Sequence, residues 1–346
     1  MGFADDIPPQ SVFDQYYRDL SKYEDRSLEP GPVEQRLRDA AGLIARFVPR
    51  LDSRVLEIGC ASGGLLKSLL DLGFQNILGM DPSPGCIRAA RKLYGVPGVA
   101  ASIFTLPAAE DPYDFLILTG VMEHIRDLDR AVEQFRRLLR KGGRVYLEVP
   151  DASRYEASLD APFQEFSTEH VNFFSKTSLA NLMRTRGFRI LAAGHTVRPL
   201  HEVTCPCTYG VFEYVAERFS LEKDLETEPG LSLYIRGCLE EDKRIRHTIQ
   251  QSLLPGERMI VWGVGTHTLR LLATGSLEPA DIVLFADSDP NYQRQELCGI
   301  PVVSPSELRN RPEPILISSR SSQREIQVQV REILGLLNPL ILLYPA

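Results

Sequence analysis

The chain has 346 residues, a formal net charge of −7 at pH 7, 43% hydrophobic and 25% charged residues, and this length predicts two domains with a core each. The acidic balance leaves no basic surplus for a nucleic-acid backbone, so a DNA or RNA partner is disfavoured. Since no apolar run reaches the roughly 20 residues of a membrane span and the acidic start lacks the basic and apolar parts of a signal peptide, we expect no membrane partner and a cytoplasmic protein.

Tyrosines cluster in residues 11–26, ahead of a helix that we expect from about Val33 to Phe47. One interpretation is that an aromatic face of this stretch simply packs on the rest of the protein. That face would consist of Phe13, Tyr16 and Leu20. The other interpretation is that residues 1–50 form a helical lid, in which Tyr17 and Tyr23 reach the substrate.

The next part of the sequence predicts a strand, a glycine turn, a helix and a second strand that ends in an acidic residue. The first strand, Arg54 to Ile58, is cut by Gly59, which lets the backbone approach a ligand, and Asp81 ends the second strand. This order builds a nucleoside site in an open α/β sheet, because the ligand lies beyond the carboxyl ends of the strands and the acid binds two ribose hydroxyls. Ala61 replaces the second glycine of a dinucleotide fingerprint, and Glu57 would repel phosphate. A ligand without phosphates therefore fits better.

The alternation of strands and helices continues to about residue 150. We expect a strand over Asp114–Gly120, a helix over Leu128–Leu139 and a strand over Arg144–Val149. Lys141–Gly143 would give the helix a basic last turn and a glycine stop. Such alternation predicts a mostly parallel, doubly wound α/β sheet.

Glu57, the glycine turn and Asp81 together resemble the class I S-adenosylmethionine-dependent methyltransferases. The resemblance implies a Rossmann-like methyltransferase sheet over residues 51–218, with S-adenosylmethionine as the cofactor. Glu57 would serve in binding rather than catalysis, since a carboxylate near the sulfonium stabilises a charge that the transition state loses. The residues implied at the cofactor are Glu57, Gly59, Cys60, Ala61, Gly63, Asp81, Pro82, Ser83, Ser102, Ile103, Thr119, Gly120 and Val121.

A glutamate and a histidine, Glu169 and His170, follow the strand expected over Arg144–Val149, which is the fifth strand of the fold that the resemblance implies. In this fold that segment faces the transferred methyl group, so His170 is the candidate base, with Glu169 or Asn172 orienting its ring. The other interpretation is a hydrogen-bonded core histidine among three phenylalanines. His124 is a competing base, although its position beside the cofactor segment favours a structural role.

A second strand, glycine turn, helix and strand-acid unit occupies residues 257–346, after a charged helical linker at 219–256. Gly263 and Gly265 form its turn, and Asp287 ends its second strand. This unit resembles the C-terminal Rossmann-like domain of the sugar C-methyltransferases, which methylate nucleotide-linked deoxysugars. That family often carries Tyr-x-Glu-His after strand five and a tyrosine-rich stretch before the core.

The chain departs from that family in two places. No cysteine precedes Cys60 in this sequence, so we expect no N-terminal zinc module, and Ser167 replaces the family's tyrosine. A nucleotide-linked sugar or related polyol is the implied small-molecule substrate, methylated at carbon or at oxygen. The residues implied at the substrate are Tyr17, Tyr23, Ser167, Asn172, Gly263, Gly265 and Asp287.

Other functions stay open at this point. The close cysteine pair, Cys205 and Cys207, has no second pair at zinc-ligand spacing, so we expect no metal. The second glycine turn has Thr268 at its third glycine position. It would serve as a packing surface, as a binding site for the nucleotide part of a sugar substrate, or as the NAD site of an oxidoreductase. A non-catalytic assembly partner that still binds the cofactor is the remaining alternative, and the oligomeric state is open.

Overall fold

The computed structural model describes residues 1–19, 32–106, 111–158, 160–167, 169–200, 203–254 and 256–345. The chain divides into two compact units. The first unit comprises Met1–Ala157, Ser167–Pro199 and Cys205–Ser232, and the second comprises Ser158–Phe166, Leu200–Thr204 and Leu233–Ala346.

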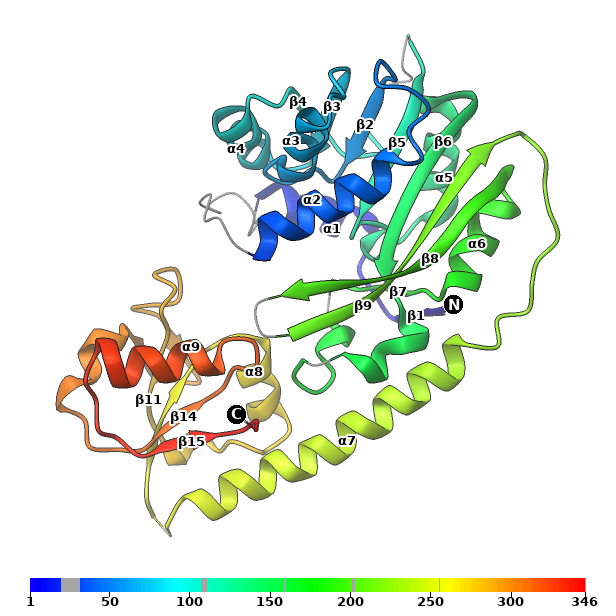
Figure 1. The fold of residues 1–346 in the computed structure, drawn as a ribbon. Helices are drawn as coiled ribbons and strands as arrows, with labels where there is room; N and C mark the ends of the chain where they lie inside the picture. The colour runs from blue at the N-terminus through cyan, green and yellow to red at the C-terminus, as the bar shows by residue number, and fades with distance from the viewer. Residues whose placement is uncertain are drawn as a thin grey trace. The chain divides into compact units, whose positions relative to one another are not determined.

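The first unit is built on a seven-stranded sheet with the order β4-β3-β2-β5-β6-β9-β8 (Figure 1). Its strands are β2 Val55–Ile58, β3 Ile77–Asp81, β4 Gly98–Ala100, β5 Tyr113–Thr119, β6 Leu139–Pro150, β8 Phe188–Leu200 and β9 Val203–Tyr214. The strands from β4 to β6 run parallel, and β9 pairs antiparallel with β6. Because β3 and β5 lie on opposite sides of β2, the sheet has a switch point where ligands of open α/β folds bind.

Helices cover both faces of this sheet. The helices of the first unit are α1 Gln10–Asp19, α2 Pro32–Ala45, α3 Gly64–Asp71, α4 Pro84–Tyr94, α5 Leu128–Leu138 and α6 Lys176–Arg184, with the short turns η1 Met122–His124 and η2 Ala152–Ala157. One core joins α5 and α6 to Leu116 and Leu118, and another joins α2, α3 and α4 to Phe115 and Ile117. Successive residues of β5 thus enter opposite cores, as in a strand buried on both faces. The expected doubly wound, mostly parallel sheet is confirmed for this unit.

Local chemistry explains where α4 begins and ends. The Ser83 side chain is the N-cap and accepts a hydrogen bond from Cys86 N at 3.1 Å. Pro84 suits the first helical turn, and Gly95 ends the helix in the left-handed conformation, with φ of 67°. These signals keep the connection between Asp81 and α4 short, at the carboxyl end of β3.

The predicted end of the helix before β6 is wrong. The helix α5 ends at Leu138, and Lys141–Gly143 lie inside β6 rather than in a last helical turn. Leu139 adopts an extended backbone, pairs with Tyr113 and buries its side chain. Burial of Leu139 therefore decides the boundary, and Gly142 takes its positive φ of 77° within the strand.

A two-stranded sheet ties the start of the chain to the middle of the first unit. The strand β1, Gly2–Phe3, pairs antiparallel with β7, Asn172–Phe173. Ala4 N also donates to Val171 O at 2.9 Å. The residues that follow His170 are thus held by the N-terminal backbone.

The second unit has a six-stranded sheet with the order β12-β13-β11-β10-β14-β15. Its strands are β10 Met259–Trp262, β11 Ile282–Ala286, β12 Glu296–Leu297, β13 Ile300–Val303, β14 Ile315–Ile317 and β15 Leu340–Leu342. All neighbours pair in parallel except β12 with β13. Its helices are α8 Thr266–Ala273 and α9 Gln323–Val328, with turns η3 Gln164–Phe166, η4 Pro279–Asp281, η5 Pro305–Asn310 and η6 Gln329–Ile333. The long helix α7, Thr227–Ser252, begins in the first unit and continues in the second.

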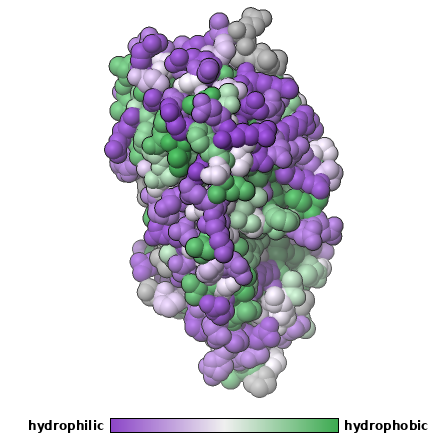
Figure 2. Space-filling view, turned by 90° about the vertical axis from the view of Figure 1, so that its right-hand side faces the viewer, coloured by the Kyte–Doolittle hydropathy of each residue, from purple (hydrophilic) through white to green (hydrophobic). Residues whose placement is uncertain are grey.

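Two further observations concern the surface and the helices. Hydrophilic side chains cover most of the face in Figure 2, with smaller hydrophobic patches between them. Of the helices that the structure describes, none combines the length and apolar character needed to cross a bilayer.

Candidate active site

The turn after β2 is held against β3 by its own backbone. Gly59 N and Cys60 N both donate to Met80 O, at 2.7 and 3.0 Å. Gly59 has φ of 78°, and a Cβ there would lie 2.5 Å from Val121 Cγ2. The structure therefore adds a reason for glycine that the sequence did not predict: the space beside Gly59 is filled by Val121.

The carboxylate of Asp81 is fixed at the carboxyl end of β3. Its Oδ2 accepts a hydrogen bond from Ala61 N, and its Oδ1 accepts one from Ser83 N, both at 2.9 Å. Asp81 is buried, and Ala61 adopts a positive φ of 46° to present its N–H. The two turns that flank the switch point thus orient one acid.

Glu57 lies on β2 and is only 3% exposed. Its Oε2 has no hydrogen-bond partner among the described residues. Burial, with a smaller contribution from Asp81, raises the pKa of Glu57 to about 8. A buried carboxyl without a donor is destabilising, so a ligand that brings an N–H or O–H group to Glu57 would be favoured here.

We expect the free energy of unfolding of the ligand-free protein to fall as pH rises from about 5 to about 8. The carboxyl titrates near 4.3 in the unfolded chain and near 8 in the folded one, so the folded state binds more protons in this window. The stability is fully present below the unfolded pKa and is lost as pH approaches the folded pKa, by at most about 1.4 kcal/mol per pH unit. Urea unfolding at several pH values checks this.

The Glu57→Gln substitution removes this titration. The free energy of unfolding of the variant is therefore expected to depend less on pH over the same window than that of the wild type. Glu217→Gln, at an exposed position, is the matched control and keeps the wild-type slope. Equal slopes for wild type and Glu57→Gln would contradict the assignment.

The segment after β5 brings charged groups to the switch point. Gly120 has φ of 70°, and a Cβ there would lie 3.1 Å from Arg198 Nη1 and 3.5 Å from Glu123 Oε1. Arg198, from β8, pairs with Glu148 of β6 at 3.4 Å. Residues of β6, β8 and the turn η1 therefore surround the segment that the resemblance assigns to the cofactor.

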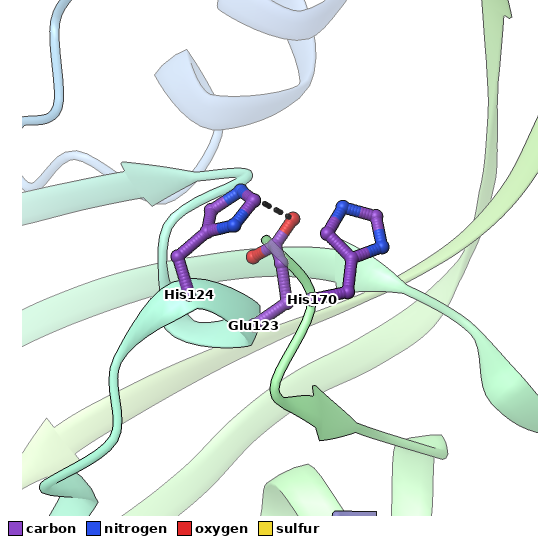
Figure 3. Close-up of side chains that lie close together, drawn as sticks. All are labelled: Glu123, His124 and His170. Atoms are coloured by element: carbon purple, nitrogen blue, oxygen red, sulfur yellow. Dashed lines mark ion pairs between the residues drawn. The ribbon is translucent and has the colours of Figure 1, made fainter. Parts of the chain in front are cut away.

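Glu123, His124 and His170 form a cluster in which one ligand atom from each lies within 4.8 Å of the others. Figure 3 shows the Glu123 carboxylate between the two imidazole rings. Glu123 Oε1 lies 3.9 Å from His124 Nε2, and the ring centroids of the histidines are 5.0 Å apart. Burial raises the pKa of Glu123, and the nearby His170 and Arg198 oppose the rise.

Backbone hydrogen bonds hold the His170 segment on η1. Val171 N donates to Glu123 O, and His124 Nδ1 donates to Glu169 O, both at 2.8 Å. Asn172 is buried, and its side-chain amide donates to Met122 O and Ile125 O at 3.2 and 2.7 Å. Asn172, expected at the substrate or beside His170, thus carries a structural role in joining the two segments.

Two tyrosines of α1 form hydrogen bonds with the carboxylate of Glu169. Tyr16 and Tyr17 donate from their hydroxyls to Glu169 Oε1 and Oε2, at 3.1 and 3.3 Å. The ring of Tyr17 also meets His124 edge-on, with centroids 5.6 Å apart. Tyr16, expected to share a packing face with Phe13, therefore contacts the site, whereas Phe13 is buried. The predicted Tyr23 lies outside the described residues.

The remaining predicted residues have diverse surroundings. Ile103 is buried in the core, and Ser102 bonds to Thr105 in a turn. Ser167 accepts a hydrogen bond at its carbonyl from His170 N. Cys60, Gly63, Pro82 and Thr119 flank the turns and the strand end already described.

The second unit repeats the turn-acid arrangement of the first. Gly263 N donates to Ala286 O at 2.8 Å, as Gly59 N does to Met80 O. Asp287 accepts from Val264 N at 3.0 Å and from Asp289 N at 2.9 Å, which matches the two backbone bonds of Asp81. Gly265, also predicted here, is the N-cap of α8.

Residues 33–193 match a family model described as a methyltransferase domain. These residues form an S-adenosylmethionine-dependent methyltransferase domain. Two properties of the domain suit this cofactor: the buried Glu57 oxygen without a partner among the described residues, and the fixed acid Asp81. The α-ammonium and ribose hydroxyls of S-adenosylmethionine are the donors that such groups bind.

Three known proteins illustrate the similarity. An uncharacterised protein of Methanocaldococcus jannaschii is 23% identical over 189 residues, which cover 54% of this chain and 85% of that protein. A ubiquinone biosynthesis O-methyltransferase of Xylella fastidiosa is 31% identical over 31% of this chain and 45% of its own length. A trans-aconitate 2-methyltransferase of Methylobacterium nodulans is 32% identical over 34% of this chain and 46% of its own length. The chain thus spans about half the length of these two named methyltransferases.

Sequence reasoning missed three residues of the first unit that lie at the candidate site. Glu123 and Tyr16 had a usable signal, because one follows a strand end and the other neighbours Tyr17 in a tyrosine-rich stretch. Arg198 had none: it reaches Glu148, which is 50 residues away in the chain, only through the pairing of distant strands.

Proposed function

We propose that the protein methylates a small, sugar-containing acceptor that is linked to a nucleotide, with S-adenosylmethionine as the methyl donor. The observation that supports this most is the arrangement around Glu169, where two tyrosine hydroxyls and two histidines meet beside the segment after β5. Sugar hydroxyls are donors and acceptors, and such a set of side chains suits them.

His170 is the proposed general base. S-adenosylmethionine, when bound, would supply a methyl group to an acceptor oxygen or carbon, and its sulfur would keep the electron pair of the broken S–CH3 bond and leave as a neutral thioether. A neutral imidazole takes the proton that the acceptor atom loses as its new bond to carbon forms. His170 then carries that proton until solvent removes it, so proton and charge balance over one turnover.

Glu169 is proposed to act with His170 by holding the site in shape. Its carboxylate accepts both tyrosine hydroxyls, and its backbone carbonyl accepts the Nδ1–H of His124. These bonds connect α1, η1 and the His170 segment through one residue. The helix α1 then serves as a lid, with Tyr17 and Ser167 proposed to contact the acceptor.

The nucleotide part of the acceptor is proposed to bind the second unit, interpreted as a Rossmann-like domain. The turn at Gly263 and Gly265 and the acid Asp287 support this, because they reproduce the backbone bonds that hold Asp81 in the methyltransferase domain. The names of the two relatives, in ubiquinone biosynthesis and trans-aconitate methylation, indicate different acceptors for similar domains. The acceptor proposed here therefore depends on this chain's own residues.

We expect radiolabelled methyl transfer to at least one nucleotide-linked deoxysugar in a panel that also holds free sugars and polyols. Asp287→Ala then raises the acceptor KM by about 10-fold or more, because a hydrogen bond to a charged group contributes roughly 1.5–3 kcal/mol, while affinity for S-adenosylmethionine is unchanged. Asp281→Ala, at the amino end of the same strand, is the matched control. Turnover on non-sugar acceptors alone would refute the substrate class, and an unchanged KM in Asp287→Ala would refute the role of the second unit.

A further inference from the structure

The cluster of Glu123, His124 and His170 has the composition of a transition-metal site. One carboxylate and two imidazoles are ligands of Zn²⁺, Fe²⁺ and related ions, and three protein ligands leave coordination positions open. Their ligand atoms already lie within 4.8 Å of one another, from two backbone segments that hydrogen bonds hold together. The backbone therefore brings the three side chains together before any ion binds.

The hydrogen bonding of His124 favours a metal at its other nitrogen. A carbonyl oxygen only accepts, so His124 Nδ1 donates to Glu169 O and the neutral ring carries its lone pair on Nε2. That Nε2 lies 3.9 Å from Glu123 Oε1. An imidazole whose tautomer is fixed by a backbone carbonyl is the usual arrangement of metal-binding histidines.

Glu123 has an acceptor that the described protein leaves unpaired. The residue is 2% exposed, and within the described ranges its Oε2 has no hydrogen-bond partner. A buried, unsatisfied carboxylate oxygen is destabilising, and a cation would satisfy it. The charged groups that face this position are Arg198 and, beyond it, Glu148. The carboxylates of Glu123 and Glu148 together offset the positive charge of the Arg198 guanidinium.

We infer that Glu123, His124 and His170 bind a divalent transition-metal ion such as Zn²⁺. Metal–ligand bonds of about 2 Å require the three ligand atoms to lie closer together than they do in the ion-free cluster. Rotation of the three side chains would bring them closer. This inference goes beyond the proposed methyl transfer from S-adenosylmethionine. It also has a consequence that rests on the proposed function: an ion on His170 occupies the lone pair that takes the acceptor's proton, so Zn²⁺ is a reversible inhibitor.

The binding test uses the full chain with Cys298→Ser, because Cys298 is the exposed cysteine of the described protein and its removal excludes zinc binding by a surface thiol. After chelator treatment and removal of the chelator, calorimetry with ZnCl₂ is expected to show one ion per chain. Glu123→Gln and His170→Ala each lower the affinity at least 10-fold, and His247→Ala, an exposed histidine on α7, leaves it unchanged. Circular dichroism checks that each variant is folded.

Three results would overturn the site: no zinc binding by the folded parent chain, equal affinity in Glu123→Gln, or equal affinity in His170→Ala. Titration with CoCl₂ is an independent readout, since bound Co²⁺ gives visible absorption that Glu123→Gln is expected to weaken. Absence of this absorption in the parent chain would overturn the site even if a variant fails to fold.

The activity test separates this inference from the proposed function. One equivalent of ZnCl₂ is expected to abolish methyl transfer, and a chelator is expected to restore it. Zinc binding without inhibition would overturn the shared use of His170 and would count against its role as the base. Inhibition without binding at one site per chain would overturn the metal site and leave the methyltransferase proposal untouched.

Discussion

A His170→Ala variant is expected to lose about 10²–10⁴-fold in kcat and to bind S-adenosylmethionine almost as the wild type does. The factor is the usual contribution of a positioned general base. Binding is spared because the cofactor groups assigned here lie on the turns around Glu57 and Asp81, whereas His170 lies on the segment held by η1. The variant separates chemistry from binding.

Single-turnover rates and calorimetry with S-adenosylmethionine, both on chelator-treated protein, check this expectation. His247→Ala is the matched control, since it removes an exposed histidine from α7. His124→Ala is the rival, because His124 lies in the same cluster and its Nε2 carries the lone pair when the ring is neutral. If His124→Ala abolishes turnover while His170→Ala retains it, with both variants folded, the assignment of the base is wrong.

Asp81→Ala is expected to weaken S-adenosylmethionine binding by about 10²-fold. Hydrogen bonds from two ribose hydroxyls to a carboxylate contribute a few kcal/mol, and every 1.4 kcal/mol is about tenfold in affinity. Asp81 suits this role because two backbone N–H groups hold its carboxylate still before the ligand arrives. Such preorganisation lowers the entropy lost on binding.

Calorimetry measures the affinity, and thermal unfolding must accompany it. Asp81→Ala also leaves Ala61 N and Ser83 N without their acceptor, so the variant is expected to be less stable by about 1–3 kcal/mol. Asp81→Asn retains one accepting oxygen and should have an intermediate Kd. Asp71→Ala removes an exposed acid paired with Lys67 and serves as the control. Wild-type affinity in folded Asp81→Ala would rule out the ribose contact.

The parts of the fold that local chemistry determines could be predicted from the sequence. The apolar strand before Gly59, the helix after it and the acid at Asp81 follow one another within about 30 residues, and backbone propensities and turn chemistry decide such short units. The same reasoning predicted two strands of the second unit, the one before Gly263 and the one that leads to Asp287, and they are β10 and β11. In each case the burial pattern of the strand agrees with an apolar run in the sequence.

Features that depend on distant partners could not be predicted in this way. The helix before β6 ends at Leu138 rather than at the glycines because Leu139 finds a core position and a strand partner. Asn172 bonds to carbonyls 47 and 50 residues away, so no local pattern reveals its role. Arg198 likewise has distant neighbours, since one lies in β6 and the other in the segment that follows β5. These contacts depend on the pairing and register of strands that are far apart in the chain. Local patterns in a single sequence do not predict that pairing.

The pairing of β1 with β7 makes the first few residues of the chain a support of the candidate site. Gly2 and Phe3 pair with Phe173 and Asn172. The backbone N–H of Ala4 donates a hydrogen bond to the carbonyl of Val171, the residue next to His170. Removing these residues would therefore take away the backbone partners of Val171, Asn172 and Phe173, which directly follow the proposed base His170. Protein prepared for assays should keep residues 1–4.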